Sequence, residues 1–128
     1  MSQAKRVLIA EDSSVIQNLT RKILEAQQYQ IAAAKNGEQV LQMLAKDSYD
    51  VLLLDINMPV MDGMECMKEI RADTTLHQPK IIFCTTENEF SKIQLAIMNG
   101  ADEYVMKPFD ETIIAGKMVQ LGIIDEAH

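Results

Sequence analysis

The stretch VLLLDINMP at residues 51–59 decides the fold of this chain. Its four consecutive apolar residues are bounded by acidic or polar positions, a pattern typical of a strand buried on both faces of a parallel sheet. Asp55 then stands at the carboxyl end of that strand, where open α/β sheets build their ligand sites. Asp55 is therefore either an ordinary turn residue or a reactive group, and the rest of the chain distinguishes the two.

The composition of the chain narrows its class. At 128 residues it is long enough for a substantial core, and we expect one domain over residues 1–128. The net charge of −7 argues against nucleic acid or an anionic membrane as a partner, because phosphate binding needs clustered Lys and Arg. No apolar run approaches the roughly 20 residues of a membrane span, and no signal peptide is visible. Cys66 and Cys84 lie within apolar patterns, which favours free thiols and a cytoplasmic location.

Strand and helix patterns alternate five times along the chain. Apolar runs predict strands at residues 7–10, 29–34, 51–54, 80–84 and 104–106. Apolar residues at helical spacing predict a helix after each strand, at Val15, Ile16, Leu19, Ile23 and Leu24, at Val40, Leu41 and Leu44, at Met64, Met67 and Ile70, at Ile93, Leu95, Ile97 and Met98, and at Ile113, Ile114 and Val119. Ser13 or Ser14 can cap the first helix, and Gly116 weakens the prediction of the last. This alternation predicts an α/β fold, a doubly wound parallel sheet with helices on both faces.

Polar residues that the hydrophobic pattern does not require follow four of the predicted strands. Glu11 and Asp12 follow the first strand, Asp55 ends the third, Thr85 ends the fourth and Lys107 ends the fifth. Each residue alone has an ordinary reading, as a helix cap or a turn residue. Because the carboxyl ends of parallel strands share one edge of the sheet, we expect the five side chains to converge. This joint placement favours a functional site.

The residue types at this edge suit metal-assisted phosphoryl chemistry. Three carboxylates in close proximity repel one another unless a cation neutralises them. Hard oxygen ligands without a His or Cys cluster suit Mg²⁺, which takes one or two carboxylates together with water and phosphate oxygens. Lys107 adds a point charge and Thr85 a hydroxyl donor. Together these groups form a cradle for a phosphoryl group.

These residues carry a resemblance to a known family. The motifs are Glu11-Asp12, Asp55 followed by Met58-Pro59 and Asp62-Gly63, Thr85, and Lys107-Pro108-Phe109. With them, over residues 5–120, the chain resembles the receiver domain of two-component response regulators in its stand-alone, CheY-like form. The resemblance implies a five-stranded parallel sheet of order 2-1-3-4-5 flanked by five helices, in a single receiver domain without an output domain.

The resemblance also implies a role for each residue of the cradle. Asp55 would accept a phosphoryl group from a phosphohistidine on a sensor kinase. Asp12, Asp55 and the backbone carbonyl of Asn57 would hold Mg²⁺ directly, while Glu11 would act mainly through a water. Lys107 would pair with Asp55 or with its phosphoryl oxygens, and the family usually has a cis bond between this lysine and the next residue, here Pro108.

A second set of implied roles concerns the switch and its duration. Thr85 would move to bond the phosphoryl group, and Tyr104 would swing inward behind it. A phosphoryl group adds roughly two negative charges and so biases an existing two-state equilibrium. Asn57 and Glu87 occupy positions whose side chains tune the rate of self-dephosphorylation in the family. Thr86 occupies a position where the family usually has Ala or Gly, and the bulk of the threonine could restrict access to Asp55. We expect a short-to-moderate lifetime.

Two other functions fit part of the pattern. A phosphatase of the haloacid dehalogenase type also uses an Asp nucleophile with Thr, Lys and Mg²⁺, but it needs a second Asp where this chain has Asn57, and a larger chain. A flavodoxin-like cofactor binder would need a phosphate-binding loop rich in Ser, Thr and Gly after the first strand, which this sequence lacks. The receiver reading accounts for all the motifs.

The expected output is protein contact, because the sequence carries no DNA-binding or catalytic output domain. The phosphorylated chain would dock on a target such as a flagellar motor or a kinase, as in chemotaxis, or would relay its phosphate to a histidine phosphotransfer protein. It would catalyse its own phosphorylation and dephosphorylation without turning over a separate substrate. Receiver homodimers depend on a charged network across the fourth and fifth helices, where only Lys92 and Lys117 supply cations, so we expect a monomer.

Overall fold

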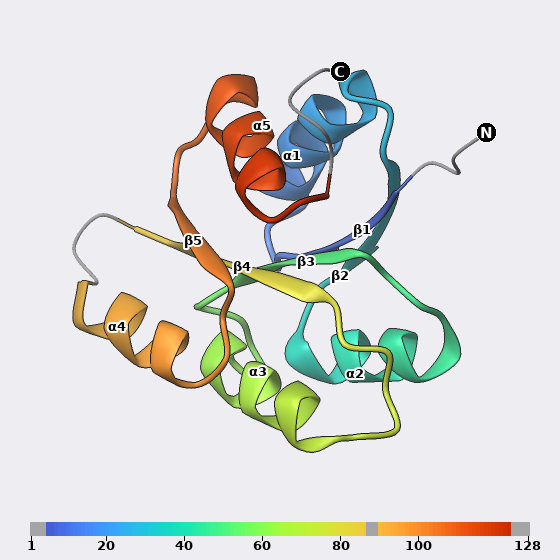
Figure 1. Cartoon of the computed structure of the whole chain (residues 1–128), viewed down its shortest axis with the longest axis vertical. Coiled ribbons are helices and arrows are strands. Elements are labelled where there is room, and N and C mark those ends of the chain that lie inside the picture. The colour runs from blue at the N-terminus through green and yellow to red at the C-terminus, as the bar shows by residue number, and fades with distance from the viewer. Residues whose placement is uncertain (1–4, 87–89, 124–128) are drawn as a thin grey trace.

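A computed structural model describes residues 5–86 and 90–123 (Figure 1). The strands are β1 Arg6–Ala10, β2 Gln30–Ala34, β3 Val51–Asp55, β4 Lys80–Thr85 and β5 Glu103–Met106. The helices are α1 Ser14–Ala26, α2 Gly37–Lys46, α3 Gly63–Ala72, α4 Phe90–Met98 and α5 Glu111–Gln120. All strand pairs are parallel, in the order β2-β1-β3-β4-β5. The predicted α/β fold and strand order are therefore confirmed.

The sheet separates two hydrophobic layers. Helices α1 and α5 cover one face, and α2, α3 and α4 cover the other (Figure 1). Along β3, Leu52 and Leu54 belong to the cluster under α2, α3 and α4, whereas Val51 and Leu53 belong to the cluster under α1 and α5. Successive side chains of a strand point to opposite faces, so a strand covered on both sides needs apolar residues at every position. This is why the run at residues 51–54 is uninterrupted.

The two cysteines lie inside these layers. Cys66 and Cys84 are both buried free thiols, as predicted. Burial raises the pKa of each thiol to about 12. Neither is therefore a reactive thiolate at neutral pH. None of the helices in the described part of the chain has the length and apolar character of a membrane span.

Side chains cap the starts of four helices. Ser13 caps α1, which decides between the two serines, and its hydroxyl accepts a hydrogen bond from the Ile16 backbone at 3.3 Å. The carboxylate or amide oxygens of Asn36, Asp62 and Asp110 cap α2, α3 and α5 in the same way. Each cap satisfies a backbone N–H that has no partner within the helix. All four capped helices begin after a loop at the carboxyl edge of the sheet, and the caps fix where those loops end.

Helix α5 forms despite the weak pattern that its sequence shows. Its packing rests on Ile114 and Met118, which are fully buried, while Ile113 is largely exposed. Gly116 lies on the exposed side, and a Cβ atom added there would meet no atom within 4 Å. The glycine therefore lowers the intrinsic helix propensity of α5, and no neighbouring element packs so close that a glycine is needed there. Burial against the sheet outweighs that deficit.

We predict that Gly116→Ala stabilises the protein by about 0.5–1 kcal/mol, because alanine loses less backbone entropy on folding and meets no obstacle here. Urea unfolding followed by circular dichroism measures the difference. Gly122→Ala is the matched control: Gly122 has a positive φ of 75°, so alanine there should destabilise. A loss of stability in Gly116→Ala would mean that this face of α5 is packed.

Candidate functional site

The strand register brings the predicted site residues to one edge of the sheet. In the β1–β3 pair Ala10 lies opposite Leu54, so Glu11 and Asp55, the next residues, follow at the same level. In the β3–β4 pair Asp55 lies opposite Cys84, and Thr85 is the last residue of β4. Lys107 directly follows β5 and its backbone N–H donates to the Thr85 carbonyl at 2.7 Å. The predicted convergence of these strand ends is confirmed.

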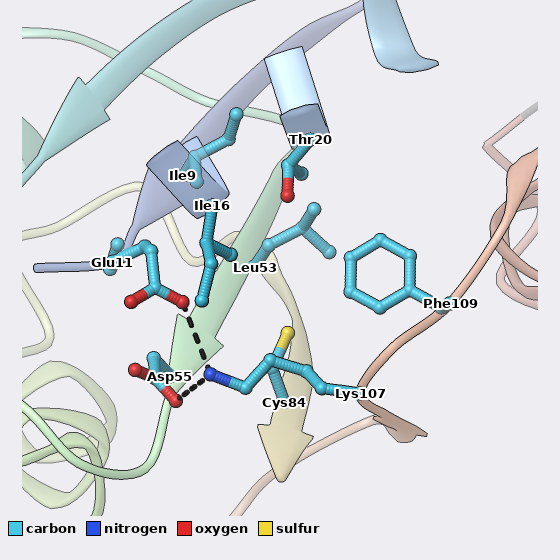
Figure 2. A pocket seen from close by; sticks show the side chains of 10 residues that line it. Ile9, Glu11, Ile16, Thr20, Leu53, Asp55, Cys84, Lys107 and Phe109 are labelled. Atoms are coloured by element: carbon cyan, nitrogen blue, oxygen red, sulfur yellow. Dashed lines mark hydrogen bonds and ion pairs between the residues drawn. The ribbon is translucent and has the colours of Figure 1, made fainter. Parts of the chain in front are cut away.

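Lys107 connects two carboxylates at the centre of this edge. Its Nζ donates to Asp55 Oδ1 at 2.8 Å and to Glu11 Oε1 at 3.1 Å (Figure 2). The side chains of Asp55 and Glu11 are only 5% and 7% exposed, and that of Lys107 is 18% exposed. Ion pairs so largely removed from water are held tightly, because little solvent competes for the donor. The arrangement fixes the position of the Asp55 carboxylate.

Burial and neighbouring charges shift the pKa values of Glu11 and Lys107. Burial raises the pKa of Glu11 and the Asp55 charge adds to the rise, although bonds from the Ser13 backbone and Lys107 oppose it. Burial also disfavours the Lys107 ammonium ion, but the bonds and charges of Asp55 and Glu11 together raise the pKa of Lys107 above its ordinary value. Negative charge thus exceeds what one lysine neutralises.

The acidic groups fit a divalent cation. Carboxylate oxygens of Glu11, Asp12 and Asp55 all lie within 4.8 Å of one another. Three hard carboxylate ligands beside one lysine leave an excess of negative charge that Mg²⁺ would neutralise. Both carboxylate oxygens of Glu11 already accept hydrogen bonds, from Lys107 and from the Ser13 backbone at 3.1 Å, whereas Asp12 is exposed. Asp12 and Asp55 are therefore better placed as direct ligands than Glu11.

The loop after β3 packs against the backbone of Asp55. The Gly63 N–H donates to the Ile56 carbonyl at 3.1 Å. A Cβ atom at Gly63 would overlap the Asp55 carbonyl oxygen and would lie 3.0 Å from the Asp55 carbonyl carbon and from the Ile56 Cα. Only glycine lets helix α3 begin this close to the strand. Asn57, in the same loop, has an exposed side chain.

The residues expected to switch lie on β4 and β5, the two strands that end beside Lys107. Thr85 is fully buried and its hydroxyl donates to the Thr86 carbonyl at 3.3 Å. Tyr104 is half-buried, with the Lys117 Nζ 4.9 Å from its ring centre, and that Nζ also pairs with Glu103 at 3.1 Å. The ring itself packs against the hydrophobic cluster under α2, α3 and α4, and the Lys117 ammonium group reaches it from α5.

Three further predictions concern single positions. The Lys107–Pro108 peptide bond is cis, as the resemblance implies. Thr86 is exposed, directly after Thr85. Glu87 lies outside the described residues. The metal, switch and lifetime roles assigned to individual side chains therefore stay predictions, while the positions of Glu11, Asp12, Asp55, Thr85 and Lys107 are established.

A small pocket opens beside Asp55, and its two lining residues from α1 were not predicted from the sequence as part of the site. It is lined by Ile16 and Thr20 of α1, Phe109 of the loop after β5, and Cys84, around the Lys107 side chain (Figure 2). Ile16 had been assigned only to the helix core, but its side chain is partly exposed. The sequence did contain a signal for this role, because Ile16 lies about one turn into the helix that begins at the site.

Comparisons with known proteins identify the family of the chain. The family model described as "Response regulator receiver domain" matches residues 7–118. The chain is 39% identical over 110 residues to the chemotaxis protein CheY of Halobacterium salinarum, covering 84% of this chain and 88% of that protein. It is 35% identical over 113 residues to the transcriptional regulatory protein YxdJ of Bacillus subtilis, covering 88% of this chain but only 48% of that protein.

A solved structure shows the same fold. The receiver domain of the sensor histidine kinase PA1611 from Pseudomonas aeruginosa, crystallised with a magnesium ion coordinated in its active site cleft, superposes with a TM-score of 0.83 at 24% identity, over 92% of this chain and 97% of that one. The parallel sheet, the acidic edge and the family match define the class. The chain belongs to the response regulator receiver family.

Proposed function

We propose that the chain is a phosphorylation-dependent signalling switch whose phosphoacceptor is Asp55. The observation that carries this proposal is the bond of 2.8 Å from Lys107 Nζ to Asp55 Oδ1, inside a cluster of three carboxylates that can hold a cation. Asp12, Asp55 and the Asn57 carbonyl would bind Mg²⁺ with Glu11 acting through a water. Bound there, the ion would neutralise the phosphoryl oxygens. The magnesium described for the PA1611 receiver supports this assignment.

The chemical step is a transfer between a phosphohistidine and Asp55. An Asp55 carboxylate oxygen attacks phosphorus and forms a P–O bond, the P–N bond to the donor breaks, and its electron pair leaves with the imidazole nitrogen. Lys107 keeps the attacking carboxylate oriented and neutralises part of the charge in the transition state. Attack by water on the acyl phosphate later returns Asp55 and releases phosphate. The protein thus acts on itself, and no separate substrate is turned over.

Phosphorylation would shift the protein between two states. The phosphoryl group brings about two negative charges and strong acceptor oxygens to a site where the buried Thr85 hydroxyl donates to the neighbouring Thr86 carbonyl. Moving Thr85 toward the phosphoryl group would open space behind it for Tyr104. Asn57, Thr86 and Glu87 would then set the lifetime by controlling access of water to Asp55.

The surface beside Tyr104 is suited to a protein partner. Large apolar side chains are exposed on β5, the strand of Tyr104 itself, and on α4 and α5, which precede and follow it in the chain: Phe90, Leu95, Ile97, Met98, Met106 and Ile113. Such a patch usually marks a protein interaction site. Together with the similarity to the CheY of Halobacterium salinarum over most of both chains, it favours a chemotaxis-type regulator that is phosphorylated by a histidine kinase and read by a protein target. We place it in the cytoplasm, where the buried free thiols persist.

The test is to label the protein and map the label. Incubation with a small phosphodonor such as acetyl phosphate and Mg²⁺ should give one acid-labile phosphate per chain, which borohydride reduction and peptide mass spectrometry place at Asp55. Omission of Mg²⁺ should remove the label, and Asp55→Ala serves as the blank. A stable phosphate, or a label mapped to another residue, would contradict the proposal.

A further inference from the structure

Gln17, in the first turns of α1, bonds to two strand ends at the acidic site. Its side-chain Nε2 donates to the Glu11 carbonyl at 2.7 Å and to the Ala34 carbonyl at 3.1 Å. Both partners are acceptors only, so the nitrogen of the amide must face them. The Glu11 N–H also donates to the Ala34 carbonyl, at 3.0 Å. Gln17 therefore joins α1 to the carboxyl ends of β1 and β2 through one partly buried amide.

These bonds act on the peptide unit that carries the acidic pair. The Glu11 carbonyl belongs to the peptide that links Glu11 to Asp12, so holding this oxygen fixes the rotation of that peptide. The Glu11 side chain is held separately, by Lys107 at 3.1 Å and by the Ser13 N–H at 3.1 Å. For exposed Asp12, no side-chain hydrogen bond is recorded among the described residues, so its direction depends on the backbone that Gln17 anchors.

We propose that Gln17 is a positioning residue that sets the affinity of the acidic site for Mg²⁺ by orienting the Glu11–Asp12 peptide. This inference rests on the proposed role of Asp12 and Asp55 as metal ligands. Groups that orient metal ligands through hydrogen bonds typically change metal affinity 10- to 100-fold when they are removed. Without Gln17, the Glu11 carbonyl would lose a donor and the turn after β1 could rotate away from the cation.

The direct test is a Mg²⁺ titration of the unphosphorylated protein, followed by backbone amide NMR shifts. Gln17→Met keeps the length of the side chain but removes the donor, and it should raise the Kd for Mg²⁺ about tenfold. Gln17→Asn keeps the amide but is one methylene shorter, and it should give an intermediate Kd. Asn18→Met, at an exposed position of the same helix, is the control and should bind Mg²⁺ as the wild type does.

The outcomes separate this inference from the proposed function. If wild-type protein shows no site-specific Mg²⁺ shifts at millimolar concentration, the metal site itself fails, and the inference with it. If the wild type binds Mg²⁺ and both Gln17 variants bind it equally well, the metal site stands and the positioning role is overturned. Urea unfolding without Mg²⁺ shows whether the variants are folded. A lower stability with an unchanged Kd would mean that Gln17 only connects α1 to the sheet and does not position the metal ligands.

Discussion

Lys107→Met should label with acetyl phosphate about 100 to 1,000 times more slowly than the wild type, the range found when one preorganised donor is removed from a charge-stabilising site. Methionine keeps much of the length of the lysine stem but removes the Nζ that lies 2.8 Å from Asp55 and 3.1 Å from Glu11. The Asp55 carboxylate would lose the group that orients it, and the phosphoryl oxygens would lose a positive charge. Initial rates of acid-labile labelling at saturating Mg²⁺ measure the effect.

Two comparisons sharpen this prediction. Lys68→Met removes one charge from an exposed position of α3 and should leave the rate unchanged, which excludes an effect of net charge. Lys107→Arg keeps the charge with a different geometry and should recover part of the rate. If Lys107→Met labelled within threefold of the wild type, the ion pair would be structural and Lys107 would have no part in the transfer.

Stability should respond to the same substitution in a pH-dependent manner. The pKa of Lys107 is higher in the folded protein than in the unfolded chain. The ion pairs of Lys107 therefore stabilise the fold fully at any pH below the ordinary lysine pKa, which includes neutral pH. Their contribution is lost only as the pH rises through the pKa of Lys107 in the folded protein. Without the lysine, Glu11 and Asp55 face each other as buried anions. The loss of unfolding free energy in Lys107→Met should therefore be largest at neutral pH and should shrink as acid protonates Glu11, whose pKa burial raises.

The fold was predictable because its strongest signals are hydrophobic. The run at 51–54 must be apolar on both sides of β3, and each predicted strand lies within one residue of its observed bounds. The site was predictable for a related reason: a parallel sheet brings its carboxyl ends together whatever the side chains are. Glu11, Asp55 and Lys107 therefore meet without any knowledge of their contacts.

The remaining features depend on tertiary packing that leaves no periodic signal. Helix α5 is held by only two fully buried side chains, Ile114 and Met118, so its pattern is weak. Gln17 bonds the backbone carbonyls of Glu11, which follows β1, and of Ala34, which ends β2, and such acceptors exist at every residue. Val60 adopts a positive φ of 69° in the loop after β3, a conformation that β-branched residues rarely take. In each case the surrounding structure overrides the local preference.

Gly63→Ala should be the most damaging small substitution outside the charged cluster, with a loss of about 3 kcal/mol in unfolding free energy. The added methyl group would overlap the Asp55 carbonyl oxygen and press on the Asp55 carbonyl carbon and the Ile56 Cα, all of them backbone atoms. A flexible side chain could turn away from the methyl group, but these backbone atoms cannot. The overlap is therefore relieved only if the start of α3 shifts away from the strand. Urea unfolding measures the loss.

Gly116→Ala is the matched control for Gly63→Ala, because the same chemical change in an exposed helix position should stabilise the protein. The same Gly→Ala change should therefore lower the unfolding free energy at residue 63 and raise it at residue 116. Labelling of Asp55 in folded Gly63→Ala should also slow, since a shift of α3 pulls on the loop that joins it to Asp55 and would displace that carboxylate relative to Lys107 and Asp12. Equal stability and equal labelling in Gly63→Ala would mean that α3 can move without carrying Asp55 with it, and the close approach of Gly63 would then have no role in placing the carboxylate.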